Sequence, residues 1–131
     1  MANAALVTQY LTPEMIEAGA DLVRSLDAAS IPVTAAYWLF DGDEPDWRLM
    51  IVSPEVAQLG PLRFYRKLGD QMRALHRPEL TSSNVTAVEP DDRVIAALRK
   101  AVQVPGIGSM RLTGNVFNGV LIPDALVYRS T

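Results

Sequence analysis

Five cationic side chains are concentrated in residues 61–77, and they are the groups whose type and spacing point most directly to chemistry. They are Arg63, Arg66, Lys67, Arg73 and Arg77, and Asp70 is the single acid among them. This segment carries a net charge of +4, whereas the rest of the chain carries −7. Such an asymmetry favours binding of an anion, a nucleic-acid backbone or an acidic partner. The alternative is a solvated helix face, or one that pairs with an acidic helix.

The element that must position these cations is a helix from Leu62 to His76. Its expected apolar stripe consists of Leu62, Tyr65, Leu68, Met72 and Leu75. No aromatic residue is interleaved on the basic face to stack a base, and Phe64 is the nearest one. The overall charge of −3 and the pI of about 5.0 also do not favour a nucleic-acid partner.

Four acids between two predicted strands form the next candidate. Asp41, Asp43, Glu44 and Asp46 could gather a hard cation such as calcium or magnesium. Their spacing lacks the glycine and the distal glutamate of a calcium loop, and Pro45 stiffens the segment. We therefore interpret it as a solvated hairpin turn and predict no metal site.

Two further features resemble catalytic elements only in part. His76, the single histidine, ends the basic helix, where a cation suits the helix dipole and where it can act as a cap. The glycine-rich segment 105–109 follows a helix and precedes a strand, which is the reverse of a phosphate loop. The chain has no cysteine, no G-x-S-x-G elbow and no H-E-x-x-H motif. We predict no catalytic residue and no cofactor.

The most informative structural pattern is a pair of apolar strands within residues 32–54. The strand from Val33 to Phe40 and the strand from Leu49 to Val52 are apolar on both faces, so both faces must be covered. This hairpin is expected at the centre of the fold or at a subunit interface. Three aromatic residues are the candidates for core or interface anchors: Trp38, Phe40 and Trp47.

The remaining elements follow from local signals. Thr12-Pro13-Glu14 starts an amphipathic helix that ends near Ala29, residues 85–88 form a short strand, and residues 89–92 start a third helix. The last segment, residues 110–128, is strand-like, with a turn at residues 118–119 or, alternatively, at 123–124. The predicted fold is a single α+β domain over residues 1–131. Its order is α-β-β-α-β-α-β-β, with three helices and a mostly antiparallel sheet.

The chain shows neither a signal peptide nor an apolar stretch of membrane-spanning length, so we expect a cytoplasmic protein without a membrane partner. The hairpin, the Gly-Pro helix start and the TGNVFNGV segment together resemble small uncharacterised bacterial proteins. The resemblance implies an architecture and a bacterial setting and transfers no activity. We predict a non-catalytic binding domain that forms a homo-oligomer or binds a protein partner. An anion or nucleic-acid binder and an enzyme with an acid/base site are the alternatives.

Overall fold

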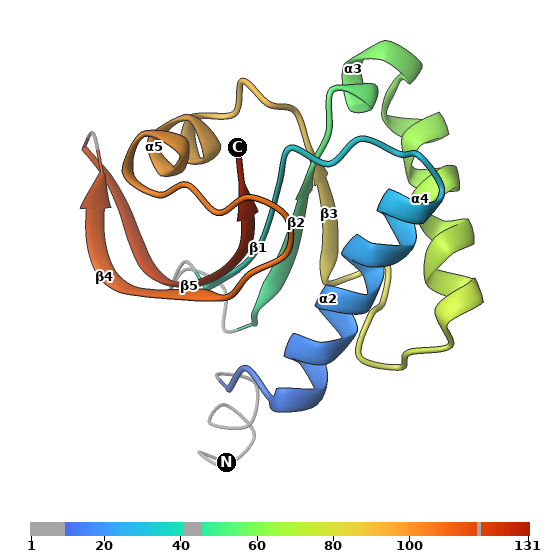
Figure 1. Ribbon diagram of the computed structural model, residues 1–131, viewed down its shortest axis with the longest axis horizontal. Coiled ribbons are helices and arrows are strands. Elements are labelled where there is room, and N and C mark those ends of the chain that lie inside the picture. The colour runs from blue at the N-terminus through green and yellow to red at the C-terminus, as the bar shows by residue number, and fades with distance from the viewer. Residues whose placement is uncertain (1–9, 41–45, 118) are drawn as a thin grey trace.

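The chain folds as helices packed around one five-stranded sheet, as the computed structural model in Figure 1 shows. The structure describes residues 10–40, 46–117 and 119–131. The helices in these ranges are α2 (Pro13–Ala28), α3 (Glu55–Leu59), α4 (Pro61–Leu75) and α5 (Arg93–Ala101). The strands are β1 (Ala35–Phe40), β2 (Arg48–Val52), β3 (Val85–Val88), β4 (Met110–Phe117) and β5 (Val120–Ser130). The predicted α+β class is confirmed, and the short α3 is an additional helix that the prediction of three did not include.

The strands lie in the order β3-β2-β1-β5-β4. Only the β2–β3 pair is parallel, and the other three pairs are antiparallel, so the prediction of a mostly antiparallel sheet is confirmed. The parallel pair arises because the chain crosses over through α3 and α4 between these two strands, as a parallel connection requires. Strands β3 and β4 therefore form the two edges of the sheet.

Both predicted hairpins are present. The first pairs β1 with β2, and Trp38 lies opposite Leu49. The second pairs β4 with β5, with Phe117 opposite Val120; of the predicted turn residues, Asn118 lies outside the described residues. Gly119 has a φ of 76°, a left-handed conformation that glycine adopts without a steric penalty. The alternative turn at residues 123–124 is wrong, because both residues lie within β5.

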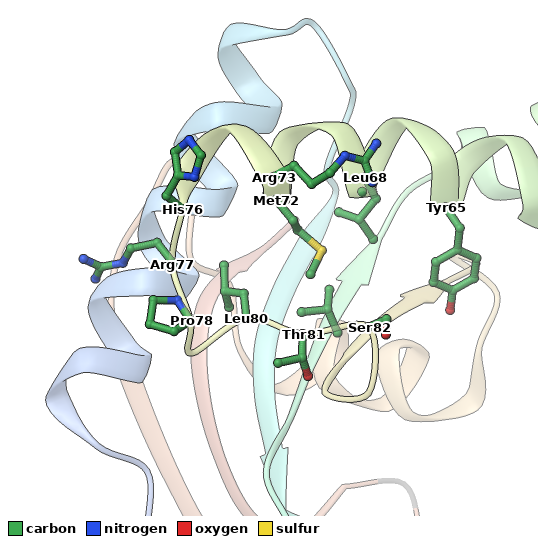
Figure 2. A pocket seen from close by; sticks show the side chains of 12 residues that line it. Tyr65, Leu68, Met72, Arg73, His76, Arg77, Pro78, Leu80, Thr81 and Ser82 are labelled. Carbon is green, nitrogen blue, oxygen red and sulfur yellow. The ribbon is translucent and has the colours of Figure 1, made fainter.

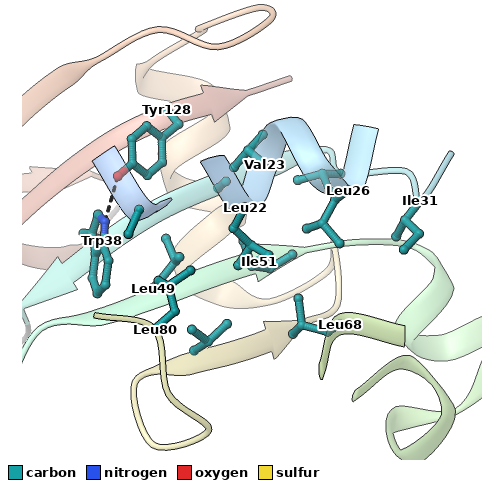
Figure 3. Packing of buried hydrophobic residues seen from close by; sticks show 14 of the residues in the cluster. Leu22, Val23, Leu26, Ile31, Trp38, Leu49, Ile51, Leu68, Leu80 and Tyr128 are labelled. Atoms are coloured by element: carbon teal, nitrogen blue, oxygen red, sulfur yellow. Dashed lines mark hydrogen bonds between the residues drawn. The ribbon is translucent and has the colours of Figure 1, made fainter. Parts of the chain in front are cut away.

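The apolar hairpin is covered on both faces by helices of the same chain. Ala36 and Trp38 of β1 pack in a core with α2 and α4, which lie side by side in Figure 1. Figure 3 shows this layer, with Leu22 and Leu26 of α2 above the sheet. On the opposite face, Tyr37 packs in a second core with Ile95 and Leu98 of α5. The expectation of cover on both faces is confirmed.

The helix boundaries follow the predicted signals. The Thr12 hydroxyl accepts a hydrogen bond from the amide of Met15 at 3.1 Å, which caps α2. The Asp92 carboxylate accepts bonds from the amides of Val94 and Ile95 at the start of α5. Within the described ranges, none of the helices combines the length and apolar composition needed to span a bilayer.

A buried hydrogen-bond chain fixes α2 to the sheet. The indole N–H of Trp38 donates to the Tyr128 hydroxyl at 2.8 Å, and that hydroxyl donates to the Ile16 carbonyl at 2.6 Å. Gly19 of α2 lies directly against this pair, since a Cβ at Gly19 would lie 2.8 Å from Trp38 Nε1. The missing side chain therefore sets how closely α2 approaches the sheet.

A second tie joins the end of β5 to the end of α2. The Arg129 guanidinium makes a two-bond ion pair with Asp27 at 2.9 and 2.7 Å, and it also donates to the carbonyls of Gly106 and Val33. The hydrogen bonds from Arg129 hold the pKa of Asp27 below its ordinary value. One side chain thus connects α2, β5 and the loop before β4.

Candidate functional site

A groove of about 860 Å³ lies between α4 and the segment that leads into the edge strand β3 (Figure 2). One wall is a stripe of α4 and the other is the segment 77–85. The residues that line it are Tyr65, Leu68, Gly69, Met72, Arg73, His76, Arg77, Pro78, Leu80, Thr81, Ser82 and Val85. Its volume lies within the range of about 300–1,000 Å³ that is typical of small-molecule sites.

The rotation of α4 about its axis differs from the sequence prediction. The fully buried residues of this helix are Phe64 and Leu68, whereas Leu62 and Tyr65 are 68% and 41% exposed. The predicted stripe of Leu62, Tyr65, Leu68, Met72 and Leu75 is therefore wrong at its first two members. Because Phe64 fills the core, Tyr65 and Met72 are turned toward the groove.

Tyr65 also closes the edge of the sheet next to the groove. Its hydroxyl accepts a hydrogen bond from the amide of Ala87 at 2.9 Å. The amide of Val85 donates to the Thr81 carbonyl at 3.2 Å. These two amides are on the side of β3 that faces away from β2, where an added strand would bind. The outward amides of this edge are therefore already bonded within the chain.

The second wall is held in place by its own hydrogen bonds. The Asn84 amide group donates to the Glu79 carbonyl at 2.8 Å, and its oxygen accepts from the amide of Thr81 at 2.9 Å. The Thr81 hydroxyl accepts from the amide of Ser83 at 3.2 Å. Leu80 and Val85 anchor the wall in the core. The groove is thus formed by a preordered segment.

The basic side chains that line the groove are Arg73, His76 and Arg77, and no acidic side chain lines it within the described part of the chain. Arg73 forms an exposed ion pair with Asp70 one turn earlier in α4. His76 ends α4 in a left-handed conformation, with a φ of 52°, and is exposed, so the predicted helix-end position is confirmed.

Arg77 has a different role from the other two. It contacts Glu17 at 3.4 Å and Asp21 at 3.9 Å, both in α2, and Glu79 at 3.7 Å. Figure 2 shows its side chain extending over α2 and away from the groove. The alternative that basic residues pair with the acidic helix is therefore confirmed for Arg77.

The other three basic residues are separate from the groove. Lys67 pairs with Glu55 of α3 at 2.7 Å, and Arg63 and Arg66 are exposed. Phe64, the aromatic residue nearest to the basic face in sequence, is fully buried and cannot stack a base there. Of the five predicted anion-binding residues, Arg73 thus lines the groove, and Arg63 and Arg66 are exposed elsewhere on α4. Arg77 and Lys67 pair with acidic residues of α2 and α3.

The aromatic candidates lie in the core of the chain. Trp38 is fully buried and Trp47 is 3% exposed, so neither indole presents a surface to a partner in this structure. Phe40 is partly buried and packs against Trp47 with a ring separation of 5.6 Å. Of the four acids of the predicted turn, Asp46 is exposed, and Asp41, Asp43 and Glu44 lie outside the described residues.

The glycine-rich segment 105–109 connects α5 to β4 and packs against β5. The amide of Gly108 donates to the Tyr128 carbonyl at 2.8 Å, and the Gly106 carbonyl accepts from Arg129. These contacts agree with a helix terminator. No protein-family model, curated protein or solved structure matches this chain. The site is therefore interpreted from its geometry alone.

The second wall of the groove was not predicted from the sequence. Leu80, Thr81 and Ser82 belong to no motif, and they reach α4 only because β3 pairs with β2 in parallel. The one signal in the sequence that could have indicated the groove is Gly69, a glycine in the middle of a helix. Such a position normally favours a residue with a side chain.

Proposed function

We propose that this chain is a binding domain whose groove takes a small molecule with an anionic head and an apolar body. The observation that carries the proposal is an apolar floor, from Leu68, Met72 and Leu80, beside the exposed guanidinium of Arg73, with no acid among the described lining residues. Pockets that bind small molecules are mostly apolar, with a few polar groups that fix orientation. A neutral or cationic ligand would not benefit from this charge.

Arg73 is the residue we assign to the anionic head. Its pair with Asp70 is exposed at both side chains, at 74% and 67%, and exposed ion pairs contribute little to stability. An incoming oxyanion can therefore replace Asp70 at low cost, and the planar guanidinium suits a two-bond contact with a carboxylate or phosphate. Arg77 stays with its acidic neighbours in α2.

A small molecule fits this groove better than an extended peptide. A peptide that adds to a sheet edge needs free backbone groups on the edge strand. The outward amides of β3 are occupied by the Tyr65 hydroxyl and the Thr81 carbonyl. A ligand here must therefore bind through side chains of the groove, without backbone pairing to β3.

The proposal is tested by titrating decanoate into the protein and measuring heat, with 1-decanol as the uncharged comparison. Decanoate should bind more tightly than decanol. Arg73→Gln should weaken decanoate binding by about tenfold, which corresponds to about 1.4 kcal/mol. Arg63→Gln is the matched control, because Arg63 is exposed on the same helix and does not line the groove. Equal weakening by both variants, or equal affinity for decanol, would contradict the proposal.

A second candidate function is self-association through the edge strand β4. This strand is eight residues long, and exposed apolar side chains lie on its hairpin, with Met110 at 41%, Val116 at 63% and Leu121 at 61%. Long apolar edge strands pair readily with other chains. Light scattering at high protein concentration should then give a dimer mass for the native chain and a monomer mass for Val116→Lys. A strictly monomeric native chain would exclude this candidate.

A further inference from the structure

Two glycines occupy helix interiors in the described ranges, and they differ in what surrounds them. Glycine inside a helix is unfavourable relative to alanine, so each position calls for a reason. At Gly19 the reason is packing, because an added Cβ would lie 2.8 Å from Trp38 Nε1 and 2.9 Å from Tyr128 Cε2. Both of these side chains are buried and are hydrogen-bonded to each other.

Gly69 has no such packing reason. The only atom within 4 Å of an added Cβ, among those that the structure describes, is Nη1 of Arg73 at 3.4 Å, which belongs to a flexible and exposed side chain. The fold would therefore accept alanine here. The space that Gly69 leaves open belongs to the groove, whose lining includes it.

The neighbours of Gly69 show where a ligand would run. Tyr65, Gly69, Met72 and His76 follow one another along a single stripe of α4, at helical spacing. This stripe is about 16 Å long, from a rise of about 1.5 Å per residue. Figure 2 shows the Arg73 side chain extending toward Leu68, with His76 and Tyr65 at opposite ends of the stripe. The Nη1 atom of Arg73 lies 3.4 Å from the position of a Gly69 Cβ.

We infer that Gly69 is a ligand-contact position, over which the apolar body of an unbranched, anionic ligand passes. This inference rests on the proposed function and adds to it the orientation and shape of the ligand. The head lies at the Arg73 guanidinium beside Gly69, and the body runs along α4 from the bare backbone of Gly69 toward Tyr65. A side chain at position 69 would occupy the path of the ligand. The glycine thus serves binding at the expense of helix stability.

The test compares Gly69→Leu, Gly69→Ala and Ala74→Leu with the native chain, using decanoate titration and thermal unfolding. Ala74→Leu is the matched control, since Ala74 is exposed on the same helix and does not line the groove. Gly69→Leu should weaken decanoate binding by about tenfold or more, as expected when a bulky side chain fills the site. Ala74→Leu should bind as the native chain does.

Gly69→Ala keeps the test decisive if the leucine variant is poorly folded. It should raise the melting temperature by about 2–4 °C, because alanine is the better helix former, and it should weaken decanoate binding measurably. Native-like decanoate binding by both Gly69 variants, together with a loss of binding in Arg73→Gln, would overturn this inference and leave the proposed function standing. Failure of the native chain to bind decanoate would overturn both.

Discussion

The contact between Gly19 and the Trp38–Tyr128 pair gives a prediction whose size follows from the structure. In Gly19→Ala the new methyl group would lie 2.8 Å from Trp38 Nε1 and closest of all to the Tyr128 hydroxyl. All three residues are buried, so neither the helix nor the rings can move freely. The substitution must either push α2 away from the sheet or break the hydrogen bond between the two side chains.

The expected loss of stability is about 3 kcal/mol. Overpacking of a core typically costs about 1–3 kcal/mol. An unsatisfied indole N–H costs about 1–3 kcal/mol more if the bond to Tyr128 breaks. The better helix propensity of alanine returns about 1 kcal/mol. Since small domains have about 5–15 kcal/mol of stability in total, the variant should fold but melt at a clearly lower temperature.

Urea unfolding of a double-mutant cycle tests this reasoning. Tyr128→Phe removes the hydroxyl that the new methyl group would meet first, so Gly19→Ala should cost less in that background. We expect a coupling free energy of about 1 kcal/mol or more between the two substitutions. Strictly additive effects, or a Gly19→Ala variant as stable as the native chain, would refute the explanation that close packing requires this glycine.

Two further predictions concern the ion pair of Asp27 with Arg129 and the hydrogen bond from the Ala87 amide to Tyr65. Asp27→Asn should lower stability near neutral pH and lose its effect in acid. The folded pKa of Asp27 is below its ordinary value, so the ion pair with Arg129 contributes fully above about pH 4 and is lost as the pH falls through the folded pKa. Urea unfolding of both chains at about pH 7 and about pH 2 checks this. An equal loss of unfolding free energy in Asp27→Asn at both pH values would contradict it. Tyr65→Phe should reduce hydrogen-exchange protection of the Ala87 amide and cost about 1 kcal/mol, because that amide loses its acceptor. Unchanged protection of Ala87 would show that this bond does not form in solution.

Local signals in the sequence predicted most of the elements. Thr12 caps α2, the apolar hairpin pairs β1 with β2, and the final strand-like segment forms the antiparallel pair of β4 with β5. Each of these signals acts within a few residues or between adjacent segments. They therefore do not depend on where distant parts of the chain lie.

The groove could not be predicted in the same way, because it depends on contacts between distant segments. Phe64 and Tyr65 are both suitable for an apolar stripe, and only the packing of α4 on the sheet places Phe64 inside and Tyr65 at the groove. The second wall depends on the parallel pairing of β3 with β2, which no local pattern encodes. Of the five basic residues predicted to bind an anion, Arg73 and Arg77 line the groove. The sequence did not indicate that an apolar floor lies beside them.

The place of β5 between β1 and β4 has a consequence for the order in which the fold can be completed during synthesis. Strand β1 is made early, yet one of its two neighbours is residues 120–130, and Ala36 pairs with Arg129. Until that last strand leaves the ribosome, β1 has an open side, and Trp38 lacks the hydroxyl of Tyr128. The sheet therefore closes only after translation of β5, and a nascent chain that stalls before β5 would present an apolar strand edge to other chains.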